Sequence, residues 1–319
     1  MGIDTAMQRM QEAIEAVVLG KTGAVRLALA CLLAEGHLLI EDVPGVGKTT
    51  LAQSLARSFD CTFRRIQFTS DLLPADITGV SVFDPASGNF NFRKGPIFAG
   101  VVLADEINRA APRTQSALLE AMSEGKVSAD GATYPLPRPF MVVATQNPVE
   151  HHGVYPLPES QLDRFLMRIR MGYPDREAEK ELLRDGSHGK VDGVAARPIC
   201  ATPVCSVEDV LRMQAQVRDV RVEESLLDYI LSIVEATRRS EFLTIGASPR
   251  AALALRRAAQ ARAYLEGRDY CIPDDVKRLA PHVLAHRLVV AADFSTPDKR
   301  SEEAEAILAE ILRGIEIPL

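Results

Sequence analysis

The sequence contains no tryptophan, and aromatic residues make up only 5% of its 319 residues. Its core must therefore be packed from aliphatic side chains. There is also no excess of basic residues, because 37 Lys and Arg stand against 43 Asp and Glu, which gives a formal net charge of −6. A protein that coats nucleic acid needs a basic footprint, so the composition argues against that class.

Cysteine and long apolar runs are also scarce. The five cysteines are odd in number and have no C-x-x-C spacing, which supports neither a disulfide framework nor a zinc site. The longest apolar runs, near 27–34 and 97–104, are far shorter than the roughly 20 residues of a membrane-spanning helix. We therefore expect a cytoplasmic protein with reduced thiols and no membrane insertion.

The first two-thirds of the chain alternates buried strands with helices. Such alternation predicts an α/β fold with a parallel sheet that helices cover on both faces. Two further segments, Phe83–Phe92 and Lys126–Leu136, alternate around turn residues and predict β-hairpins. The expected strands are His37–Glu41, Thr62–Phe68, Gly100–Glu106, Phe140–Pro148 and Arg164–Met171, and the expected helices are Met7–Val18, Ala24–Ala34, Thr49–Phe59 and Thr114–Ser123.

After Tyr173-Pro174 the pattern indicates helices alone. We expect an α/β domain with two hairpin insertions over 1–174, a linker with one helix over 175–205, and a smaller all-α lid domain over 206–319. The expected helices are Asp175–Leu183, Val207–Val217, Glu223–Thr237, Pro249–Glu266, Pro273–Ala285 and Ser301–Ile315.

The stretch EDVPGVGKTTLA lies between a predicted strand and a predicted helix. It fits the phosphate-binding pattern G-x-x-x-x-G-K-[ST] except at Asp42, where the first glycine is expected. Gly45 and Gly47 permit the tight backbone that turns N–H groups toward a phosphate. Lys48 can reach the β- and γ-phosphates, and Thr49 can offer a hydroxyl to Mg²⁺. Since Asp tolerates turn conformations, the pattern predicts a working nucleotide site rather than a simple Gly-rich turn.

Polar side chains follow two buried strands. Asp105 and Glu106 end the strand of VVLADE, and Asn147 ends the strand of VVATQNP. Ligands bind at the carboxyl edge of a parallel sheet, where one acid can hold Mg²⁺ and the next can activate a water. Asn147 can orient that water, although Asn-Pro is also a common turn opener.

Two arginines are candidates for contacts with a phosphate. Arg164 directly precedes the last predicted strand, a position that an ordinary surface arginine could also occupy. Ser248 and Pro249 predict a helix start that puts Arg250 in the first turn, where the helix dipole disfavours a cation. A cation at an unfavourable position indicates a task such as meeting a phosphate.

The segments EDVPGVGKT, VVLADEINRA, VVATQNP, LPESQLDRF and GASPRA, in this order, resemble the MoxR family of AAA+ ATPases over about residues 5 to 317. The resemblance implies a Walker A loop, a Walker B pair with Asp105 on Mg²⁺ and Glu106 as the base, and a sensor 1 at Asn147. It implies an arginine finger at Arg164, a role in which Arg109 or Arg168 could share, and a sensor 2 at Arg250 acting in cis or in trans. The implied nucleotide-binding residues are Gly20, Asp42, Val43, Pro44, Gly45, Val46, Gly47, Lys48, Thr49 and Thr50, with Thr49 also on the metal.

The resemblance further implies ATP and Mg²⁺ as ligands and a homo-oligomeric ring, with a hexamer as the expected form. Its work would be chaperone-like remodelling of a partner protein complex, which could contain a von Willebrand factor A-domain protein. A DNA motor is the first alternative, but the hairpin tips at Asp84–Asn89 and Asp130–Ala132 are not basic. A switch that binds ATP with little hydrolysis is the second. His151-His152 could be a metal pair, but a loop or pore position fits them better.

Overall fold

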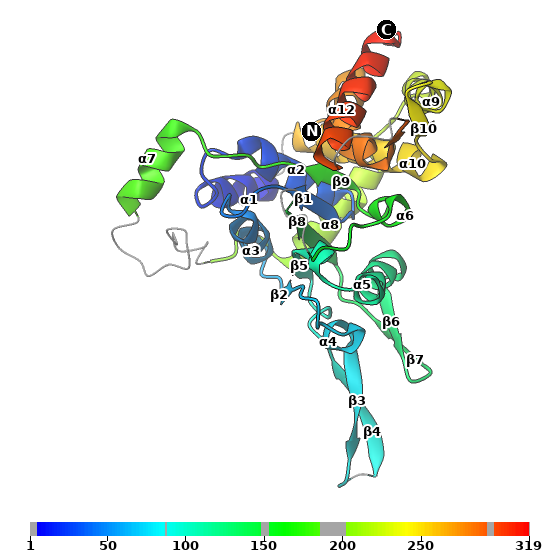
Figure 1. Ribbon diagram of the computed structural model, residues 1–319. Coiled ribbons are helices and arrows are strands. Elements are labelled where there is room, and N and C mark those ends of the chain that lie inside the picture. The colour runs from blue at the N-terminus through cyan, green and yellow to red at the C-terminus, as the bar shows by residue number, and fades with distance from the viewer. Residues whose placement is uncertain (1–4, 87, 148–152, 186–201, 292–296, 319) are drawn as a thin grey trace.

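The computed structural model describes residues 5–86, 88–147, 153–185, 202–291 and 297–318. A central sheet of five strands has the order β2-β5-β8-β1-β9, and all its neighbouring strands are parallel (Figure 1). The predicted parallel sheet is thereby confirmed. Its strands are β1 (Leu38–Glu41), β2 (Phe63–Gln67), β5 (Val101–Asp105), β8 (Met141–Gln146) and β9 (Met167–Ile169).

Alternating side chains of these strands enter two hydrophobic clusters. Leu38 and Ile40 of β1 belong to one cluster, and Leu39 between them belongs to the other. The first cluster includes the buried faces of α1 (Thr5–Glu15), α2 (Thr22–Leu33) and α3 (Lys48–Ser58). The second includes those of α4 (Pro74–Thr78) and α5 (Pro112–Glu124). Burial on both faces explains why these strands are continuously apolar.

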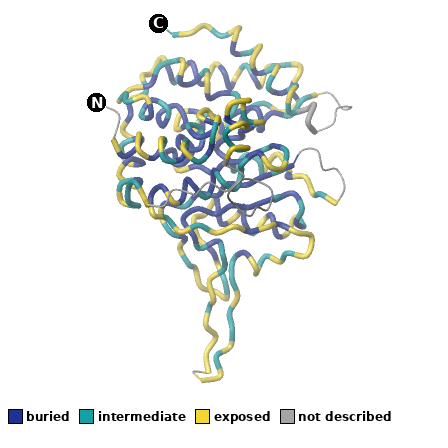
Figure 2. The backbone as a smooth tube through the Cα atoms, turned by 90° about the vertical axis from the view of Figure 1, so that its left-hand side faces the viewer, coloured by how far each residue is buried: buried dark blue, intermediate teal, exposed yellow. Residues whose placement is uncertain are grey.

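Two hairpins project from the side of the molecule on which α4 and α5 lie (Figure 1). The strands β3 (Gly79–Asp84) and β4 (Asn89–Lys94) form the longer hairpin, and β6 (Lys126–Ala129) and β7 (Ala132–Pro135) form the shorter one. Both predicted hairpins are confirmed, but the first begins four residues earlier than expected. Figure 2 shows the longer hairpin as a mostly exposed arm below the buried sheet.

An aromatic contact joins the two hairpins. The rings of Phe92 in β4 and Tyr134 in β7 are stacked, with centroids 4.2 Å apart and an interplanar angle of 17°. Nearer the tip, Phe83 and Phe90 form a second ring pair at 5.3 Å. These two side chains are 50% and 72% exposed, so the end of the arm presents aromatic rather than basic surface.

The chain after β9 is mainly helical. It contains α7 (Arg176–Asp185), α8 (Val207–Arg218), α9 (Glu224–Arg239), α10 (Pro249–Leu265), α11 (Pro273–Leu284) and α12 (Pro297–Gly314). The expectation of helices alone is wrong in one respect, because β10 (Leu243–Ile245) and β11 (Val289–Val290) pair as an antiparallel ribbon. Segments of two or three residues are too short for an alternation signal.

The helical lid and the sheet share one core. The first hydrophobic cluster runs from α1 and the sheet into α8, α9, α10, α11 and α12. A polar contact crosses the same junction, where Gln214 Nε2 of α8 donates to the carbonyl of Leu32 at 2.7 Å. Among the residues that the structure describes, none of the helices is long and apolar enough to span a bilayer.

Candidate nucleotide site

The predicted phosphate-binding loop connects β1 directly to α3. Gly45 and Gly47 have φ angles of +86° and +94°, which are left-handed conformations that glycine adopts without strain. Helix α3 begins at Lys48, so Thr49 and Thr50 lie in its first turn. The N–H groups of a loop and helix start of this kind attract anions. Val43 and Pro44 precede Gly45, and the buried Val46 lies between the two glycines.

Asp42, the residue that replaces the expected glycine, has a structural task. Its carboxylate is buried, and Oδ2 accepts hydrogen bonds from the backbone N–H groups of Met171 at 2.7 Å and Gly172 at 2.6 Å. Oδ1 accepts from the N–H of Val43 at 2.8 Å. A glycine could make none of these bonds. Asp42 thus fixes the start of the loop to the segment that follows β9.

Gly20, which the resemblance implies as a nucleotide-binding residue, lies against the start of α7. Gly20 has φ +67°, and a Cβ placed there would lie 3.0 Å from the Cβ of Ala178 in α7. The ammonium of Lys21 donates to the carbonyl of Tyr173. Burial lowers the pKa of Lys21, while the charges of Asp42 and Asp175 oppose that shift. Residues 20–21 therefore adjoin the loop through the chain that leads into α7.

Asp105 ends β5 and is held from two sides. Its Oδ1 accepts from the hydroxyl of Thr145 in β8 at 2.6 Å, and its Oδ2 accepts from Nη2 of Arg65 in β2 at 2.6 Å. The carboxylate is 12% exposed. An oxygen ligand of this kind, together with the hydroxyl of Thr49, suits Mg²⁺, which takes one or two carboxylates plus phosphate oxygens. The residues present therefore fit the metal that the sequence predicts.

Glu106 follows in a left-handed conformation with φ 56°, an uncommon backbone for a residue other than glycine. Its N–H donates to the hydroxyl of Thr145 at 2.9 Å. Its carboxylate accepts from Nε2 of Gln67 at 2.6 Å, and Nε of Arg109 lies 3.4 Å away. The strained backbone turns the Glu106 side chain out of β5 toward Gln67 at the end of β2.

Asn147 directly follows β8 and is 7% exposed. The register pairs Gln146 with Glu41 and Ala104 with Ala144, so Asn147 lies at the sheet edge that also carries Asp42 and Asp105. The structure thus brings the loop, the acid pair and the amide together. His151-His152 lie outside the described residues.

Arg164 lies at the opposite edge of the sheet, where the strands begin, and not at the carboxyl edge. Leu166, two residues later, donates its N–H to the carbonyl of His37 at 2.8 Å, and His37 precedes β1 while Asp42 follows it. The four residues of β1 separate His37 from Asp42, and a strand of that length spans roughly 13 Å. Nη1 of Arg164 instead donates to the carbonyl of Leu119 at 2.7 Å in α5. The side chain of Arg164 therefore faces away from the phosphate-binding loop.

Arg250 lies beside Arg164 and not beside the loop. The predicted helix start is confirmed, because Ser248 caps α10 by accepting from the N–H of Ala251 at 3.2 Å. The side chain of Arg250 is 54% exposed and 3.9 Å from Asp163. Arg164 and Arg250 line one hollow of about 390 Å³ whose wall also includes Ser116, Leu119, Glu120, Ser123, Glu124 and Gln161.

Neither of the two alternative finger residues lines the hollow that contains Arg164 and Arg250. Arg168 lies in β9, is 8% exposed, and forms ion pairs with Glu41 at 3.2 Å and with Glu305 of α12 at 2.8 Å. Its guanidinium is therefore buried and paired with two carboxylates. Arg109 pairs with Glu106 at the carboxyl edge of the sheet.

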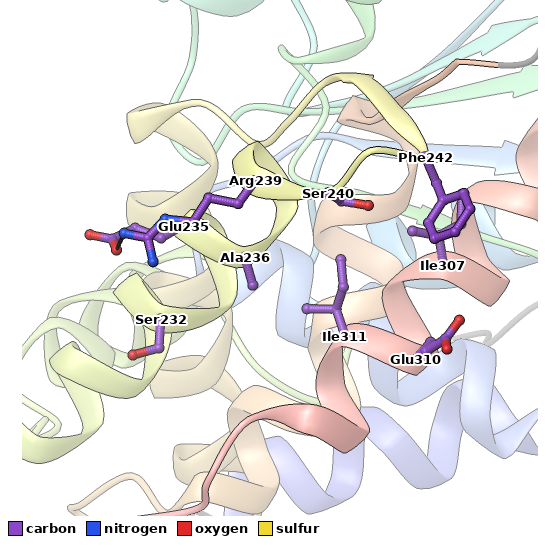
Figure 3. A pocket seen from close by; sticks show the side chains of 9 residues that line it. All are labelled: Ser232, Glu235, Ala236, Arg239, Ser240, Phe242, Ile307, Glu310 and Ile311. Carbon is purple, nitrogen blue, oxygen red and sulfur yellow. Dashed lines mark hydrogen bonds and ion pairs between the residues drawn. The ribbon is translucent and has the colours of Figure 1, made fainter.

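A second hollow, of about 450 Å³, lies on the lid between α9 and α12 (Figure 3). It contains none of the residues that the sequence predicts for the site. Its wall combines Ala236, Phe242, Ile307 and Ile311 with the polar residues Ser232, Glu235, Arg239, Ser240 and Glu310.

Three residues beside the acid pair were not predicted. Arg65, Gln67 and Thr145 all contact Asp105 or Glu106. Arg65 and Gln67 lie on β2 and Thr145 lies on β8, so their neighbours are set by the strand order. The one available signal was the position of Gln67 and Thr145 at strand ends, close to the predicted carboxyl edge.

The parallel sheet, the glycine loop at the start of α3, the acid pair at the end of β5 and the helical lid define a P-loop protein of the AAA+ class. Consistent with this class, residues 37–167 match the model for the ATPase family associated with various cellular activities (AAA). Residues 235–311 match the model for the AAA lid domain.

Within that class, the chain belongs to the MoxR family. It is 42% identical to Chaperone MoxR1 of Mycobacterium tuberculosis over 314 residues, which are 96% of this chain and 80% of that protein. It is 31% identical to Protein MoxR of Methylorubrum extorquens, over 97% of this chain and 93% of that one.

Two further comparisons cover almost the whole chain. The uncharacterized protein YeaC of Bacillus subtilis is 49% identical over 97% of this chain and 93% of its own. The crystal structure of a candidate ATPase from Cytophaga hutchinsonii superposes with a TM-score of 0.86 at 38% identity, covering 98% of this chain and 95% of that one.

Proposed function

We propose that this chain is a Mg²⁺-dependent ATPase that works as a homo-oligomeric ring, with six subunits as the expected number. The observation that carries the proposal is that the site residues lie at two opposite edges of the sheet, and therefore on two different surfaces of the molecule. The loop, Asp105, Glu106 and Asn147 lie at one edge of the sheet, and Arg164 with Arg250 lies at the other. A head-to-tail contact that closes into a ring would bring the two faces together.

Each residue has a role that its position supports. The N–H groups of the loop and the ammonium of Lys48 hold the phosphates, and Thr49 and Asp105 hold the metal, which supplies positive charge against the phosphate oxygens. Glu106 takes the proton of the attacking water, and Asn147 orients that water. Arg164 and Arg250 approach the γ-phosphate of the neighbouring subunit, where an arginine finger can be worth on the order of 10³–10⁵ in rate in GTPases.

The work done by hydrolysis is chaperone-like remodelling of a partner protein complex in the cytoplasm. Two observations support a protein client over nucleic acid: one relative is named a chaperone, and the arm ends in the exposed rings of Phe83 and Phe90. A nucleic-acid motor would need basic side chains there. By its family, a partner with a von Willebrand factor A domain is one candidate.

The test is Mg²⁺-dependent ATP turnover per subunit as the protein concentration rises, with Arg164→Ala beside the wild type. We expect turnover to climb with concentration in the wild type and to collapse in the variant while ATP binding persists. Turnover that is independent of concentration and of Arg164 would overturn the ring mechanism. Loss of turnover in Glu106→Gln would separately support the assigned base.

A further inference from the structure

Arg65 forms an ion pair with the acid assigned to the metal. It lies on β2, the edge strand next to β5, and its guanidinium donates to Oδ2 of Asp105 from Nη2 at 2.6 Å and from Nε at 3.1 Å. The side chain is 51% exposed. A flexible cation that reaches this carboxylate from solvent therefore lies where Mg²⁺ would have to be held.

The other oxygen of Asp105 is already engaged. Oδ1 accepts from the hydroxyl of Thr145 at 2.6 Å, a neutral donor buried between the strands. A metal or its bound water that approaches Asp105 must therefore share the carboxylate with a guanidinium. Like charges at such short range repel even at a partly exposed site.

The position of the guanidinium is defined by a second contact. Nη2 of Arg65 also donates to Oε1 of Gln67 at 3.0 Å. Residues 65 and 67 point to the same face of β2 because side chains alternate along a strand, and Gln67 is in register with Asp105. Gln67 thus aligns Arg65 with the carboxylate, and the contact is a built feature of this edge rather than a stray surface pair.

We propose that Arg65 lowers the affinity of the nucleotide site for Mg²⁺ by competing with the metal for the carboxylate of Asp105. This inference rests on the proposed function, since it assigns Asp105 to the metal. In this proposal Arg65 is a positioning residue that acts on the metal through Asp105.

The test measures metal binding rather than catalysis. The full chain, saturated with a non-hydrolysable ATP analogue, is titrated with Mn²⁺, and the free ion is followed by its electron paramagnetic resonance signal. We expect Arg65→Gln to bind Mn²⁺ about two- to fivefold more tightly than the wild type, within the range for the loss of a half-exposed charge. Arg65→Lys, which keeps the charge, should fall between the two.

Arg64→Gln is the matched control, because Arg64 is an exposed arginine on the same strand whose side chain points to the opposite face. It should bind Mn²⁺ like the wild type. If Arg65 acts through Asp105, its effect should disappear when the carboxylate is removed. In an Asp105→Asn background, Arg65→Gln should therefore change the affinity for Mn²⁺ by less than about twofold, as expected for two coupled residues.

The outcomes separate this inference from the proposed function. Unchanged or weaker Mn²⁺ binding in Arg65→Gln, with normal nucleotide-dependent binding in the wild type, would overturn the competition and leave the ATPase proposal standing. If the wild type bound no Mn²⁺ with the analogue, or Asp105→Asn bound it equally well, the metal assignment and this inference would both fail.

Discussion

Asp42 and Gly172 are joined by a 2.6 Å hydrogen bond from the Gly172 N–H to Oδ2 of the aspartate, so the residue that breaks the common loop pattern fastens the loop. We predict that Asp42→Gly, which restores the pattern, lowers the free energy of unfolding by about 1–3 kcal/mol, the cost of leaving buried N–H groups unpaired. It should also weaken ATP binding, because the start of the loop is released. Urea unfolding and a nucleotide titration would measure both effects.

The control for this prediction is Asp228→Ala, because Asp228 is an exposed aspartate in α9. It should leave the unfolding free energy and ATP binding close to those of the wild type. If Asp42→Gly were as stable as the wild type and bound ATP equally well, the loop would not depend on its attachment to the chain after β9.

A second prediction concerns pH. Burial, reinforced by the charges of Arg250 and Arg257, lowers the pKa of His37 from 6.5 to about 4 against one backbone hydrogen bond that raises it. The unfolded chain therefore binds a proton in the window between these values and the folded chain does not. Stability should fall as the pH drops from 6.5 toward 4, by about 3 kcal/mol from this one group.

Urea unfolding at several pH values would measure the slope. We expect His37→Gln to be less stable at pH 7, because the N–H of Val142 loses the Nδ1 acceptor at 3.0 Å, but to show a shallower decline toward pH 4. Burial also lowers the pKa of His286, so this residue preserves part of the pH dependence in both proteins. If the free energy of unfolding fell equally steeply with pH in the variant and the wild type, His37 would not be the cause of this pH dependence.

Much of the site could be predicted because its residues are local signals. The loop with its two glycines, the acids at the end of β5 and the Ser248 cap before Arg250 are each contained in a few consecutive residues. The periodicity that predicts strands also predicts which edge of the sheet carries their last side chains. The sequence alone therefore predicts that Asp105 and Asn147 share one edge.

The contacts of Arg65 and Asp42 could not be predicted in the same way. Arg65 meets Asp105 because β2 lies next to β5 in a fixed register, and neither strand order nor register is written in a local pattern. Asp42 meets residues 171 and 172 across a separation of about 130 positions. Sequence patterns identify side chains at an edge, but the strand order decides which of them touch.

The two hairpins offer a third prediction. Phe92 and Tyr134 stack at 4.2 Å, and aromatic pairs of this kind are worth about 0.5–1.5 kcal/mol beyond their buried area. A double-mutant cycle of Phe92→Ala and Tyr134→Ala should give a coupling of that size in urea unfolding. Spin labels at the two tips should show a broader distance distribution in either variant.

Phe83→Ala is the control for the hairpin prediction, because Phe83 pairs with Phe90 within the longer hairpin and does not bridge the two. It should leave the distance distribution unchanged. A distribution that stayed narrow without the stack would mean that the hairpins are held together by their bases alone.

The last prediction tests whether Arg164 serves a neighbour. Arg164 donates to α5 at the edge of the sheet opposite the loop. We therefore expect Lys48→Ala and Arg164→Ala to damage different halves of a site that two subunits would share. Each variant alone should turn over ATP slowly. In an equal mixture of subunits, about one quarter of the contacts in a head-to-tail ring pair an intact loop with an intact arginine. The turnover of the mixture should therefore exceed the mean of its two components, and mixing Lys48→Ala with the double variant should give no such gain. A mixture that only averaged its components would mean that Arg164 does not act across the subunit boundary.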